Sequence, residues 1–512
     1  MIRSLNPATL KINESIKETK SEELINIIKK TRKVQTTWKK TRLQIRKELM
    51  RKLLEYISEN MDDIAKIIHN ETGKPRIEAI NSDIIAGLGT IRYTIDVLEE
   101  VLKPEKIEFT GMKIPMWYMG RSSYIHPQPL GVLGIISPWN YPFGIPFSQI
   151  VMAIAVGNGV ILKPSSETPL IGLKMKELLE KVGFPKNLVQ VVPGRGSRIG
   201  SALVKSDVDR IIFTGSVGVG KRIMEMASQK IKPVTLELGG KSPMIILKDT
   251  ALKRTVSGAI WGSFVNAGQT CAGIKRIYVQ EEIYDDFLEL FKQKAEKLKQ
   301  GWDWDDPEIS IGPVINESAL KDMEDHVARA KEQGATVLTG GKKRNDLKGY
   351  FFEPTILINL SQDMDAVQEE IFGPIVTVLK FSSSDQAVKM ANDTSFGLFG
   401  SVWTTDLENG EKIAKQMTMG TVAINNHVYT YGLPHTPWGG NKNSGIGRTH
   451  GKFGFEELLE PHHIHIDNGK IKEDPWWQPY NREKLKLQSD INDVLFRKKY
   501  LKMFKLIKKL KK

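Results

Sequence analysis

Apolar and polar positions follow two different periods along the chain. Between residues 21 and 70 apolar side chains recur every three or four positions, as from Leu49 to Met61, which predicts helices that end near Gly73. From about residue 130 short apolar runs are followed by a turn and then by a helical pattern, as in PLGVLGIISPWN followed by QIVMAIAVGN. Short strands that alternate with helices are typical of α/β proteins.

The strand candidates form two series. The first contains PLGVLGII, GVILK, LVQVV and DRIIFTG, and the second begins near residue 241 with SPMIILKD, RIYVQEE, FFEPTILIN, PIVTVLKF and GTVAINN. Repeated strand–turn–helix units predict parallel sheets with helices on both faces. The sequence therefore predicts an α/β protein with two doubly wound lobes, whose ligands bind at the carboxyl ends of the strands.

Composition narrows the class of protein. With 512 residues, 40% hydrophobic and 26% charged, the chain is long enough for several globular domains. Its single cysteine excludes an intrachain disulfide framework and fits a reducing compartment. The first twenty residues contain no apolar run that could act as a signal peptide, and no segment approaches the ~18 apolar residues that span a bilayer. We therefore expect a cytoplasmic protein.

The positive charge is concentrated at the C-terminus. Of the net charge of +14, nine Lys or Arg lie in residues 497–512, which contain no Asp or Glu, so the rest of the chain carries only +5. No nucleic-acid partner is expected, because the charge is confined to a tail without a recognisable binding module. Within the 470–512 extension, an apolar series at helical spacing predicts a basic amphipathic helix: Phe496, Tyr500, Met503, Ile507 and Leu510.

Three interpretations of this predicted helix are open. Its basic face fits an anionic membrane surface, where each basic residue contributes ~1 kcal/mol. A helix packed on the protein's own surface and a disordered basic end explain the same pattern.

Several polar residues at turns could carry chemistry. Cys271 in GQTCAG could be a nucleophile or a small buried apolar residue. Glu237 in TLELGGKSP could be a general base if burial raises its pKa, although a salt-bridged glutamate fits equally. Asn140 in SPWNYPF could stabilise an oxyanion with its amide, or could simply form a turn.

Two further turns could hold a phosphate or a ribose. The loop FTGSVGVGK lies between a strand and a helix, with Ser216 as a candidate N-cap, and free N–H groups at a helix start bind phosphate. Its glycines do not have the G-x-G-x-x-G spacing, so a flexible helix entry is an equal explanation. Lys163, at the end of a strand, could reach a ribose hydroxyl or could be an exposed turn lysine.

The motifs PWNYPF, LKPS, FTGSVGVGK, ELGGKSP, GQTCAG, EEIFGP and PWGGNKNSGIGR occur together in this order. In order and spacing they resemble the aldehyde dehydrogenase superfamily from about residue 15 to about residue 468. The 34-residue interval from Glu237 to Cys271 also matches that family.

The resemblance implies a catalytic cycle. Cys271 matches the nucleophile that attacks the aldehyde to give a thiohemiacetal, and Asn140, with the backbone N–H of Cys271, matches the oxyanion hole. Hydride transfer to NAD or NADP leaves a thioester, and Glu237 matches the base that activates water. Because relatives that pass the acyl group to coenzyme A typically lack this glutamate, hydrolysis is expected.

The resemblance also assigns coenzyme contacts. Lys163 matches a residue at the adenosine ribose, where many NAD-preferring members carry a glutamate three positions later; here that position is Ser166, followed by Glu167, so NADP is also possible. Six more residues are implied: Gly215 and Ser216 at the pyrophosphate, Trp139 and Leu238 beside the coenzyme, and Glu370 and Phe372 at the nicotinamide ribose. No metal site is expected.

The implied domains complete the prediction. Residues 1–109 and 128–240 are expected to form a coenzyme-binding domain, 241–440 a catalytic domain, 110–127 and 455–468 a small β oligomerisation arm, and 470–512 the basic C-terminal extension. A homodimer or homotetramer is expected, as in the family.

The substrate is less defined. Succinic semialdehyde dehydrogenases have an arginine where this chain has Ser148, and the nearby Pro146 and Phe147 favour an apolar or aliphatic aldehyde. A semialdehyde dehydrogenase is the alternative. A catalytically silent protein that binds a membrane surface is the alternative from another class, which the presence of all three implied catalytic residues disfavours.

Overall fold

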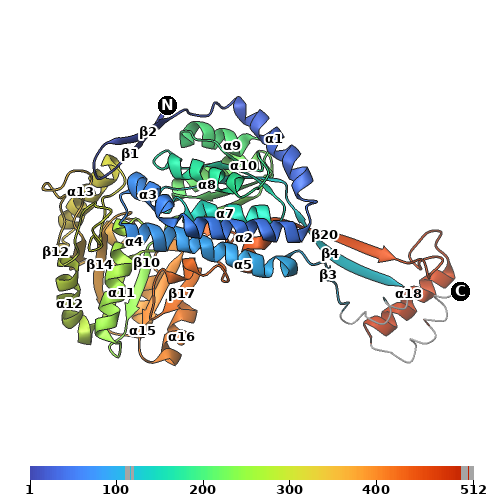
Figure 1. Cartoon of the computed structure of the whole chain (residues 1–512). Coiled ribbons are helices and arrows are strands. Elements are labelled where there is room, and N and C mark those ends of the chain that lie inside the picture. The colour runs from blue at the N-terminus through green and yellow to red at the C-terminus, as the bar shows by residue number, and fades with distance from the viewer. Residues whose placement is uncertain (110–115, 117–119, 498–505, 507–512) are drawn as a thin grey trace. The chain divides into compact units, whose positions relative to one another are not determined.

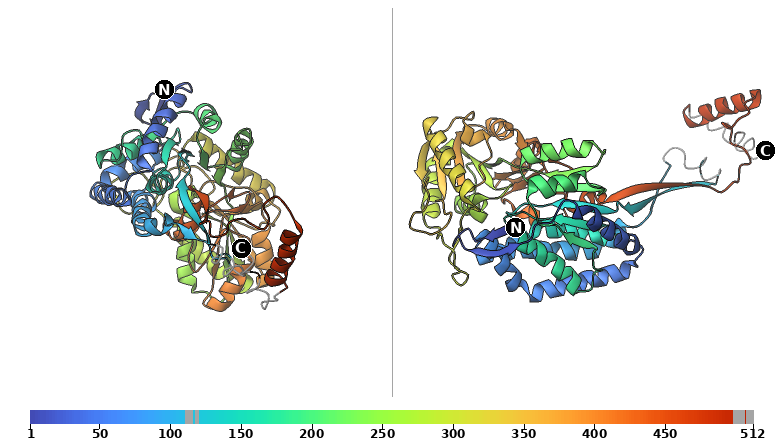
Figure 2. Two further views of the ribbon diagram at one scale, coloured as in Figure 1. Left: turned by 90° about the vertical axis from the view of Figure 1, so that its right-hand side faces the viewer. Right: turned by 90° about the horizontal axis from the view of Figure 1, so that it is seen from above.

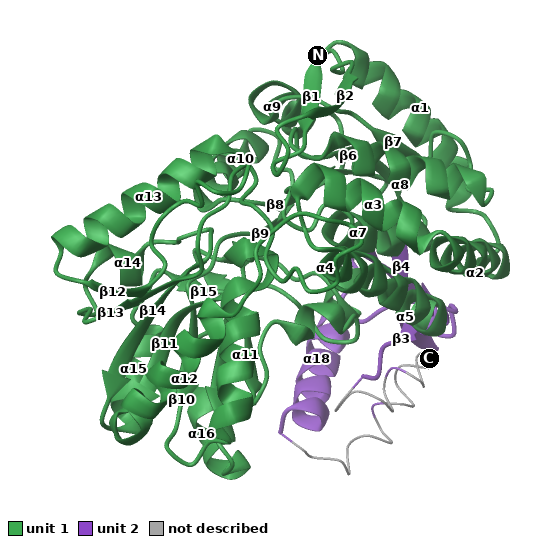
Figure 3. Ribbon diagram, turned by 60° about the vertical axis from the view of Figure 1, so that its left-hand side comes forward, with its two compact units in different colours: residues 1–98, 129–458 green, residues 99–128, 459–512 purple. Residues whose placement is uncertain are grey.

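The computed structural model describes residues 1–109, 116, 120–497 and 506. Contacts divide the chain into two units, shown in Figure 3: Met1–Leu98 with Pro129–Leu458, and Glu99–Gln128 with Leu459–Lys512. Unit 1 contains two lobes, each built on its own sheet (Figure 1). Unit 2 contains a small sheet and the C-terminal extension.

The N-terminal region is helical, as the apolar spacing predicts. After a hairpin of β1 (Ile2–Leu5) and β2 (Ile12–Ile16), the chain forms α1 (Glu23–Trp38), α2 (Leu43–Glu59) and α3 (Met61–Thr72). The last of these ends at Gly73, whose φ of 75° is left-handed and therefore favours glycine. A short α4 (Arg76–Glu78) and a π-helical segment η1 (Ala79–Ile85) then lead into α5 (Ala86–Val101).

The sheet of the first lobe has six strands. In spatial order they are β19 (Gly445–Ile446), β9 (Val234–Glu237), β8 (Arg210–Thr214), β5 (Val132–Ile136), β6 (Gly159–Lys163) and β7 (Val189–Val191). All neighbours are parallel except β19, which runs antiparallel to β9. Neither of these two strands is among the predicted ones. The order reverses direction between β5 and β8, and ligands of such sheets bind at a reversal of this kind.

Helices cover this sheet and connect its strands. Those that pack on it are α1, α7 (Gly144–Ala155), α8 (Pro169–Lys181) and α10 (Val217–Ser228). Between β7 and β8 lie η2 (Gly196–Gly200) and α9 (Ser201–Lys205). Every residue of β5 and β6 is buried, which explains why both strands read as continuous apolar runs in the sequence.

The sheet of the second lobe has seven strands. In spatial order they are β12 (Thr336–Thr339), β13 (Thr355–Ile358), β14 (Ile375–Phe381), β11 (Ile274–Gln280), β10 (Ser242–Ile246), β16 (Phe399–Trp403) and β17 (Thr421–Ile424). Only β12 is antiparallel to its neighbour. Strand β16, which contains Gly400, is not among the predicted strands.

Helices and short elements surround this second sheet. The helices are α11 (Leu252–Phe264), α12 (Tyr284–Glu296), α13 (Glu317–Glu332), α14 (Asp365–Gln368), α15 (Ser384–Asn392) and α16 (Leu407–Gln416). A further helix, α17 (Gly451–Glu456), lies against the first lobe, where the rings of Phe455 and Tyr93 of α5 are 6.2 Å apart. The short elements are η3 (Val265–Gly268), η4 (Glu281–Ile283), η5 (Tyr429–Gly432) and the pair β15 (Phe396–Gly397) and β18 (Asn441–Lys442).

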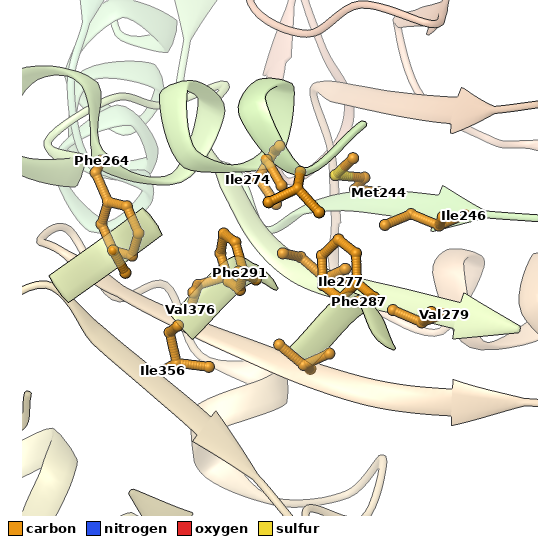
Figure 4. Close-up of a cluster of buried hydrophobic side chains, with 14 of the residues drawn as sticks. Met244, Ile246, Phe264, Ile274, Ile277, Val279, Phe287, Phe291, Ile356 and Val376 are labelled. Atoms are coloured by element: carbon orange, nitrogen blue, oxygen red, sulfur yellow. The ribbon is translucent and has the colours of Figure 1, made fainter. Parts of the chain in front are cut away.

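A buried apolar cluster supports the segment that carries Cys271 (Figure 4). Phe264, the last residue of α11, stacks on Phe291 of α12 with ring centres 6.1 Å apart, and Phe291 also stacks on Phe287 at 5.2 Å. Ile274 and Ile277 of β11 pack in the same cluster. The short segment from Phe264 to Ile274 is therefore anchored in the core at both ends.

Unit 2 is built on a three-stranded sheet in the order β20 (Leu459–Asp467), β4 (Arg121–Pro129) and β3 (Glu105–Lys106). The long strands β4 and β20 lie side by side (Figure 2). Arg121 joins the extension to this sheet, because its guanidinium pairs with Asp467 at 2.8 Å and with Asp474, and lies 5.0 Å from the centre of the Trp476 ring.

The extension continues into α18 (Arg482–Leu495). Phe496 follows this helix and its side chain is 75% exposed, while Tyr500, Met503, Ile507 and Leu510 of the predicted amphipathic face lie outside the described residues. Within the described part of the chain, no helix combines the length and apolar character needed to cross a membrane.

Candidate functional site

The candidate site lies between the two lobes of unit 1. Glu237 is the last residue of β9, Asn140 follows β5, and Cys271 precedes β11. The Gly-Gly turn after β9 contacts the cysteine directly: a Cβ at Gly240 would lie 2.3 Å from the carbonyl oxygen of Cys271. Only glycine allows this approach, which brings Glu237 close to the thiol.

The loop that presents Cys271 has an unusual backbone. Asn266, Ala267 and Gly268 all have positive φ, at 55°, 52° and 69°. A left-handed conformation is costly for the two residues with side chains, so neighbouring contacts must maintain it. The backbone N–H of Asn266 donates to both carboxylate oxygens of Glu78, at 3.1 and 3.0 Å, and the Gln269 side chain donates to the Asn266 carbonyl at 3.0 Å.

Asn140 is held against this loop. Its Nδ2 donates to the carbonyl of Gln269 at 3.1 Å, and its own carbonyl accepts from Nδ2 of Asn266 at 3.0 Å. An amide nitrogen has two hydrogens, so one N–H of Asn140 can still reach a ligand. The structure therefore brings Asn140 and Cys271 together, as the resemblance implies.

Burial dominates the ionisation of the thiol and the carboxyl. It raises the pKa of Cys271 to about 12, and the nearby charges of Glu237 and Glu370 raise it further. Burial also raises the pKa of Glu237 well above its usual range, although the charge of Arg448 opposes this shift. Oε1 of Glu237 has no hydrogen-bond partner among the described residues. Burial thus disfavours the charged form of both groups, and a carboxylate with a raised pKa is a stronger base once it is ionised.

Aromatic side chains line the surroundings of Cys271. The thiol residue and Tyr431 pack against a buried cluster that contains Trp438, and the Tyr431 and Trp438 rings meet edge to face at 5.1 Å. Tyr141 is hydrogen-bonded through its hydroxyl to Thr270 at 2.6 Å. The sequence analysis misses these three aromatic residues, although two of them lie inside the quoted motifs PWNYPF and PWGG.

The residues singled out for substrate preference lie in the interior of α7. Ser148 is buried and shares a hydrogen bond with Thr90 at 3.1 Å. Phe147 is fully buried and stacks on Phe143 at 4.4 Å. These side chains take part in helix packing, so the evidence for an apolar site comes from the aromatic residues around Cys271.

The predicted phosphate loop has an open helix start. α10 begins at Val217, directly after Ser216, whose side chain is exposed and caps no backbone N–H. A Cβ at Gly218 would meet no atom within 4 Å, and the N–H of Gly215 donates to the carbonyl of Glu237 at 3.0 Å. The free N–H groups of this first turn are available to a phosphate.

Lys163 lies at the end of β6 and is 5% exposed. Burial lowers its pKa to about 8, and its amine has no hydrogen-bond acceptor among the described residues, which fits a ligand hydroxyl or phosphate. Ser166 is partly exposed on the following turn. The next residue, Glu167, accepts a hydrogen bond from Nδ2 of Asn316 at 3.4 Å.

The remaining predicted coenzyme residues lie around the Gly-Gly turn. Glu370 accepts the N–H of Gly240 at 3.0 Å, and burial raises the pKa of this carboxyl. Trp139 and Phe372 meet edge to face at 5.5 Å. Leu238 packs over Gly220 of α10, where a Cβ would lie 2.7 Å from its side chain. Among the described residues, no group of three or more His, Cys, Asp or Glu side chains is arranged to hold a metal ion.

Comparisons with known proteins identify the family of this chain. The model of the aldehyde dehydrogenase family matches residues 1–464. The betaine aldehyde dehydrogenase of Bacillus subtilis (strain 168) is 37% identical over 472 residues, which cover 91% of this chain and 94% of that protein. The putative succinate-semialdehyde dehydrogenase [NADP(+)] 2 of Mycobacterium tuberculosis (strain ATCC 25618 / H37Rv) is 36% identical over 430 residues, covering 84% of this chain and 81% of that one.

Solved structures share the fold. The NAD+ complex of an aldehyde dehydrogenase from Bacillus cereus superposes with a TM-score of 0.86 at 33% identity, covering 91% of this chain and 93% of that one. The family match over nearly the whole chain excludes the alternative of a catalytically silent binding protein. The chain belongs to the aldehyde dehydrogenase family and is an NAD(P)-dependent aldehyde dehydrogenase.

Proposed function

We propose that this enzyme oxidises an aldehyde with a neutral, apolar body to the free carboxylic acid. The observation that supports this substrate class is the environment of Cys271. Its neighbours are aromatic and aliphatic side chains, and the charges that act on the thiol most strongly are the carboxylates of Glu237 and Glu370. A substrate with its own carboxylate would be repelled at this position.

The proposed roles follow from the geometry. Cys271 attacks the aldehyde carbon, and the free N–H of Asn140 donates to the resulting oxyanion. Glu237, when ionised, accepts the proton of the thiol; after releasing that proton to solvent, it accepts a proton from the water that releases the acid. NAD(P), when bound, accepts the hydride. The residues present fit this coenzyme, because Lys163 lies at the carboxyl end of β6 and the start of α10 is open to a phosphate.

The first prediction concerns these roles. Cys271→Ala is expected to abolish aldehyde oxidation, because no other thiol exists in the chain. Glu237→Gln preserves size but cannot take a proton, so kcat is expected to fall about 10²-fold. The wild-type rate should rise from acidic to alkaline pH, since the raised pKa of Cys271 limits the thiolate. Both variants and the pH dependence are measured by the steady-state formation of reduced coenzyme. The control variant is Glu225→Gln, at an exposed position of α10. Full activity of either active-site variant would contradict the assignment.

A cationic aldehyde is the second candidate substrate, and the aromatic and acidic residues near the thiol support it. The rings of Tyr141, Tyr431 and Trp438 lie near the thiol, together with two carboxylates. Aromatic faces and carboxylates both attract a quaternary ammonium group. The Bacillus subtilis relative is named for betaine aldehyde, which carries such a group.

A substrate panel separates the candidates. With an aliphatic aldehyde, betaine aldehyde and succinic semialdehyde, we expect kcat/KM for the aliphatic aldehyde to exceed that for the semialdehyde at least about 10-fold, because a buried carboxylate would face two anionic residues. A leading value for betaine aldehyde would select the second candidate. A clear preference for succinic semialdehyde would reject both and restore the semialdehyde alternative.

We also propose that the enzyme accepts NADP. Ser166 places no carboxylate beside Lys163, and the carboxylate of Glu167 is engaged by Asn316. A 2′-phosphate would thus approach a lysine amine without meeting an acidic side chain.

A negative charge introduced at position 166 tests this use of NADP. Ser166→Glu is expected to lower kcat/KM for NADP at least about 10-fold, because it adds a negative charge where a phosphate would bind. Measurement with NAD in parallel is the control, since NAD lacks the phosphate and its kcat/KM should not fall. An equal loss with both coenzymes would show that the substitution disturbs the turn instead.

The domain and partner assignments are also proposals. We assign coenzyme binding to residues 1–109 and 128–240, catalysis to 241–440, and subunit contact to the arm of 110–127 and 455–468, in a cytoplasmic homodimer or homotetramer. The edge strand β20 supports an arm that pairs with a second copy, because its residues after Leu459 are all exposed.

We further propose that the extension contacts an anionic membrane surface. Its exposed aromatic residues include Trp477 at 52%, Tyr480 at 69% and Phe496 at 75%, and Phe496 directly precedes the segment 497–512 with its nine basic residues. Aromatic rings beside a basic cluster suit the interface of an anionic bilayer.

Vesicle binding tests this contact. The full chain is expected to co-sediment with phosphatidylserine-containing vesicles and to lose most of that binding when it ends at Phe496, because each lost basic residue removes ~1 kcal/mol of attraction. Phosphatidylcholine vesicles are the control. Equal sedimentation of both chains would reject the proposal, and a change in oligomer size on truncation would assign the tail to a second copy.

A further inference from the structure

The loop that presents Cys271 is held by a carboxylate far away in the sequence. Glu78 ends α4, 188 residues before Asn266, and belongs to none of the motifs that mark the active site. Building on the proposed roles of Cys271 and Asn140, we propose that Glu78 is a positioning residue: it fixes the Asn266 turn and thereby aligns the Asn140 amide with Cys271.

The contacts form a continuous path. Both oxygens of Glu78 accept the N–H of Asn266, at 3.1 and 3.0 Å. The side chain of the same asparagine donates to the carbonyls of Asn140 and Gln269, at 3.0 and 3.1 Å. Asn140 in turn donates to Gln269 at 3.1 Å. Asn266 therefore links Glu78 on one side to the candidate oxyanion donor on the other.

The strained backbone explains why this acceptor matters. Asn266 and Ala267 have left-handed φ values of 55° and 52°, which residues with side chains seldom adopt. Without Glu78 the N–H of Asn266 would be left buried and unpaired, and the turn would lose the contact that opposes its relaxation. Relaxation would shift the Gln269 carbonyl, which anchors the Asn140 amide.

The same segment also holds the other half of the site. Asp83, in η1, accepts the backbone N–H groups of Phe143 and Gly144, at 3.1 and 2.8 Å, directly after the Asn140 turn. Lys74 pairs with Asp83 at 2.6 Å, and both side chains are almost completely buried. One short stretch, residues 74–83, thus fixes the turn of Asn140 through Asp83 and the loop of Cys271 through Glu78.

The charged groups around Glu78 act in both directions. Burial raises its pKa to about 7, the positive charge of Lys74 lowers it, and the negative charge of Asp83 raises it. Ionising a carboxyl group in such surroundings costs free energy, so Glu78 is better explained by its contact with Asn266 than by surface solubility.

Glu71 provides a matched control. It is buried, whereas Glu78 is partly buried; its pKa is also raised to about 7 by burial, and it accepts two backbone N–H groups, those of Leu170 and Ile171 at 2.9 Å each. Its partners belong to α8 and, through the Ser4 hydroxyl at 2.8 Å, to β1, and none of them lies in the Cys271 loop. Loss of either carboxylate should therefore lower stability, but only loss of Glu78 should disturb the catalytic geometry.

The experiment compares Glu78→Ala, Glu78→Gln and Glu71→Ala in the full chain. For Glu78→Ala we expect kcat to fall about 10²-fold, the size of a lost oxyanion donor, with KM for the coenzyme changed less than about 2-fold. Glu78→Gln keeps an acceptor oxygen and should retain kcat within about 5-fold. Glu71→Ala should lower the unfolding midpoint to a similar degree and leave kcat within about 2-fold.

A second readout does not depend on turnover. Amide hydrogen exchange of residues 265–271 is expected to quicken in Glu78→Ala and to remain at the wild-type rate in Glu71→Ala. If the wild type oxidises no aldehyde, the proposed function fails, while this exchange still tests the positioning contact. Equal kcat losses in Glu78→Ala and Glu71→Ala, or unchanged loop exchange in Glu78→Ala, would overturn the proposal.

Discussion

The backbone around Cys271 is packed directly against two glycine turns, and the rest of the site depends on this contact. A Cβ at Gly240 would lie 2.3 Å from the Cys271 carbonyl oxygen, and a Cβ at Gly268 would lie 2.2 Å from that of Gly373. Even one methyl group at either position would force the segments apart. Because the main chains touch, the side chains of Glu237 and Glu370 come within electrostatic range of the thiol.

Two buried lysines donate hydrogen bonds to the backbone in and near these turns. Lys275 donates to the carbonyls of Gly268 and Gly373, at 2.6 and 2.7 Å, and Lys241 donates to that of Ala366 at 2.8 Å. Burial lowers the pKa of both amines, that of Lys275 to about 7. Such groups are tolerated in the interior because they donate to backbone carbonyls, Lys275 to two in the glycine turns and Lys241 to one in α14. Their contribution is to hold the geometry, while burial and, to a smaller degree, the charges of Glu237 and Glu370 raise the pKa of the thiol.

Strand β9 connects the two tasks of the enzyme. The carboxyl of its last residue, Glu237, is close enough to Cys271 for its charge to raise the pKa of the thiol. The backbone carbonyl of the same residue accepts the N–H of Gly215 in the proposed phosphate loop. The following Leu238 packs on Gly220 of α10. A displacement of this strand would consequently alter coenzyme binding and proton transfer together, which explains how one short element can couple them.

Much of this organisation could be predicted from local sequence. The apolar runs of β5 and β6 identify buried strands, and the motif series places Cys271, Glu237 and Asn140 in one family-like site. Strand β16 was missed because Gly400 and Ser401 interrupt its apolar pattern, and β9 because it is short and ends in a charged residue. Tertiary structure alone determines three other features. They are the aromatic side chains around Cys271, the burial of Phe147 and Ser148, and the contact between Glu78 and Asn266. Local patterns record which face of an element is buried, whereas contacts between residues more than a hundred positions apart depend on how the elements pack.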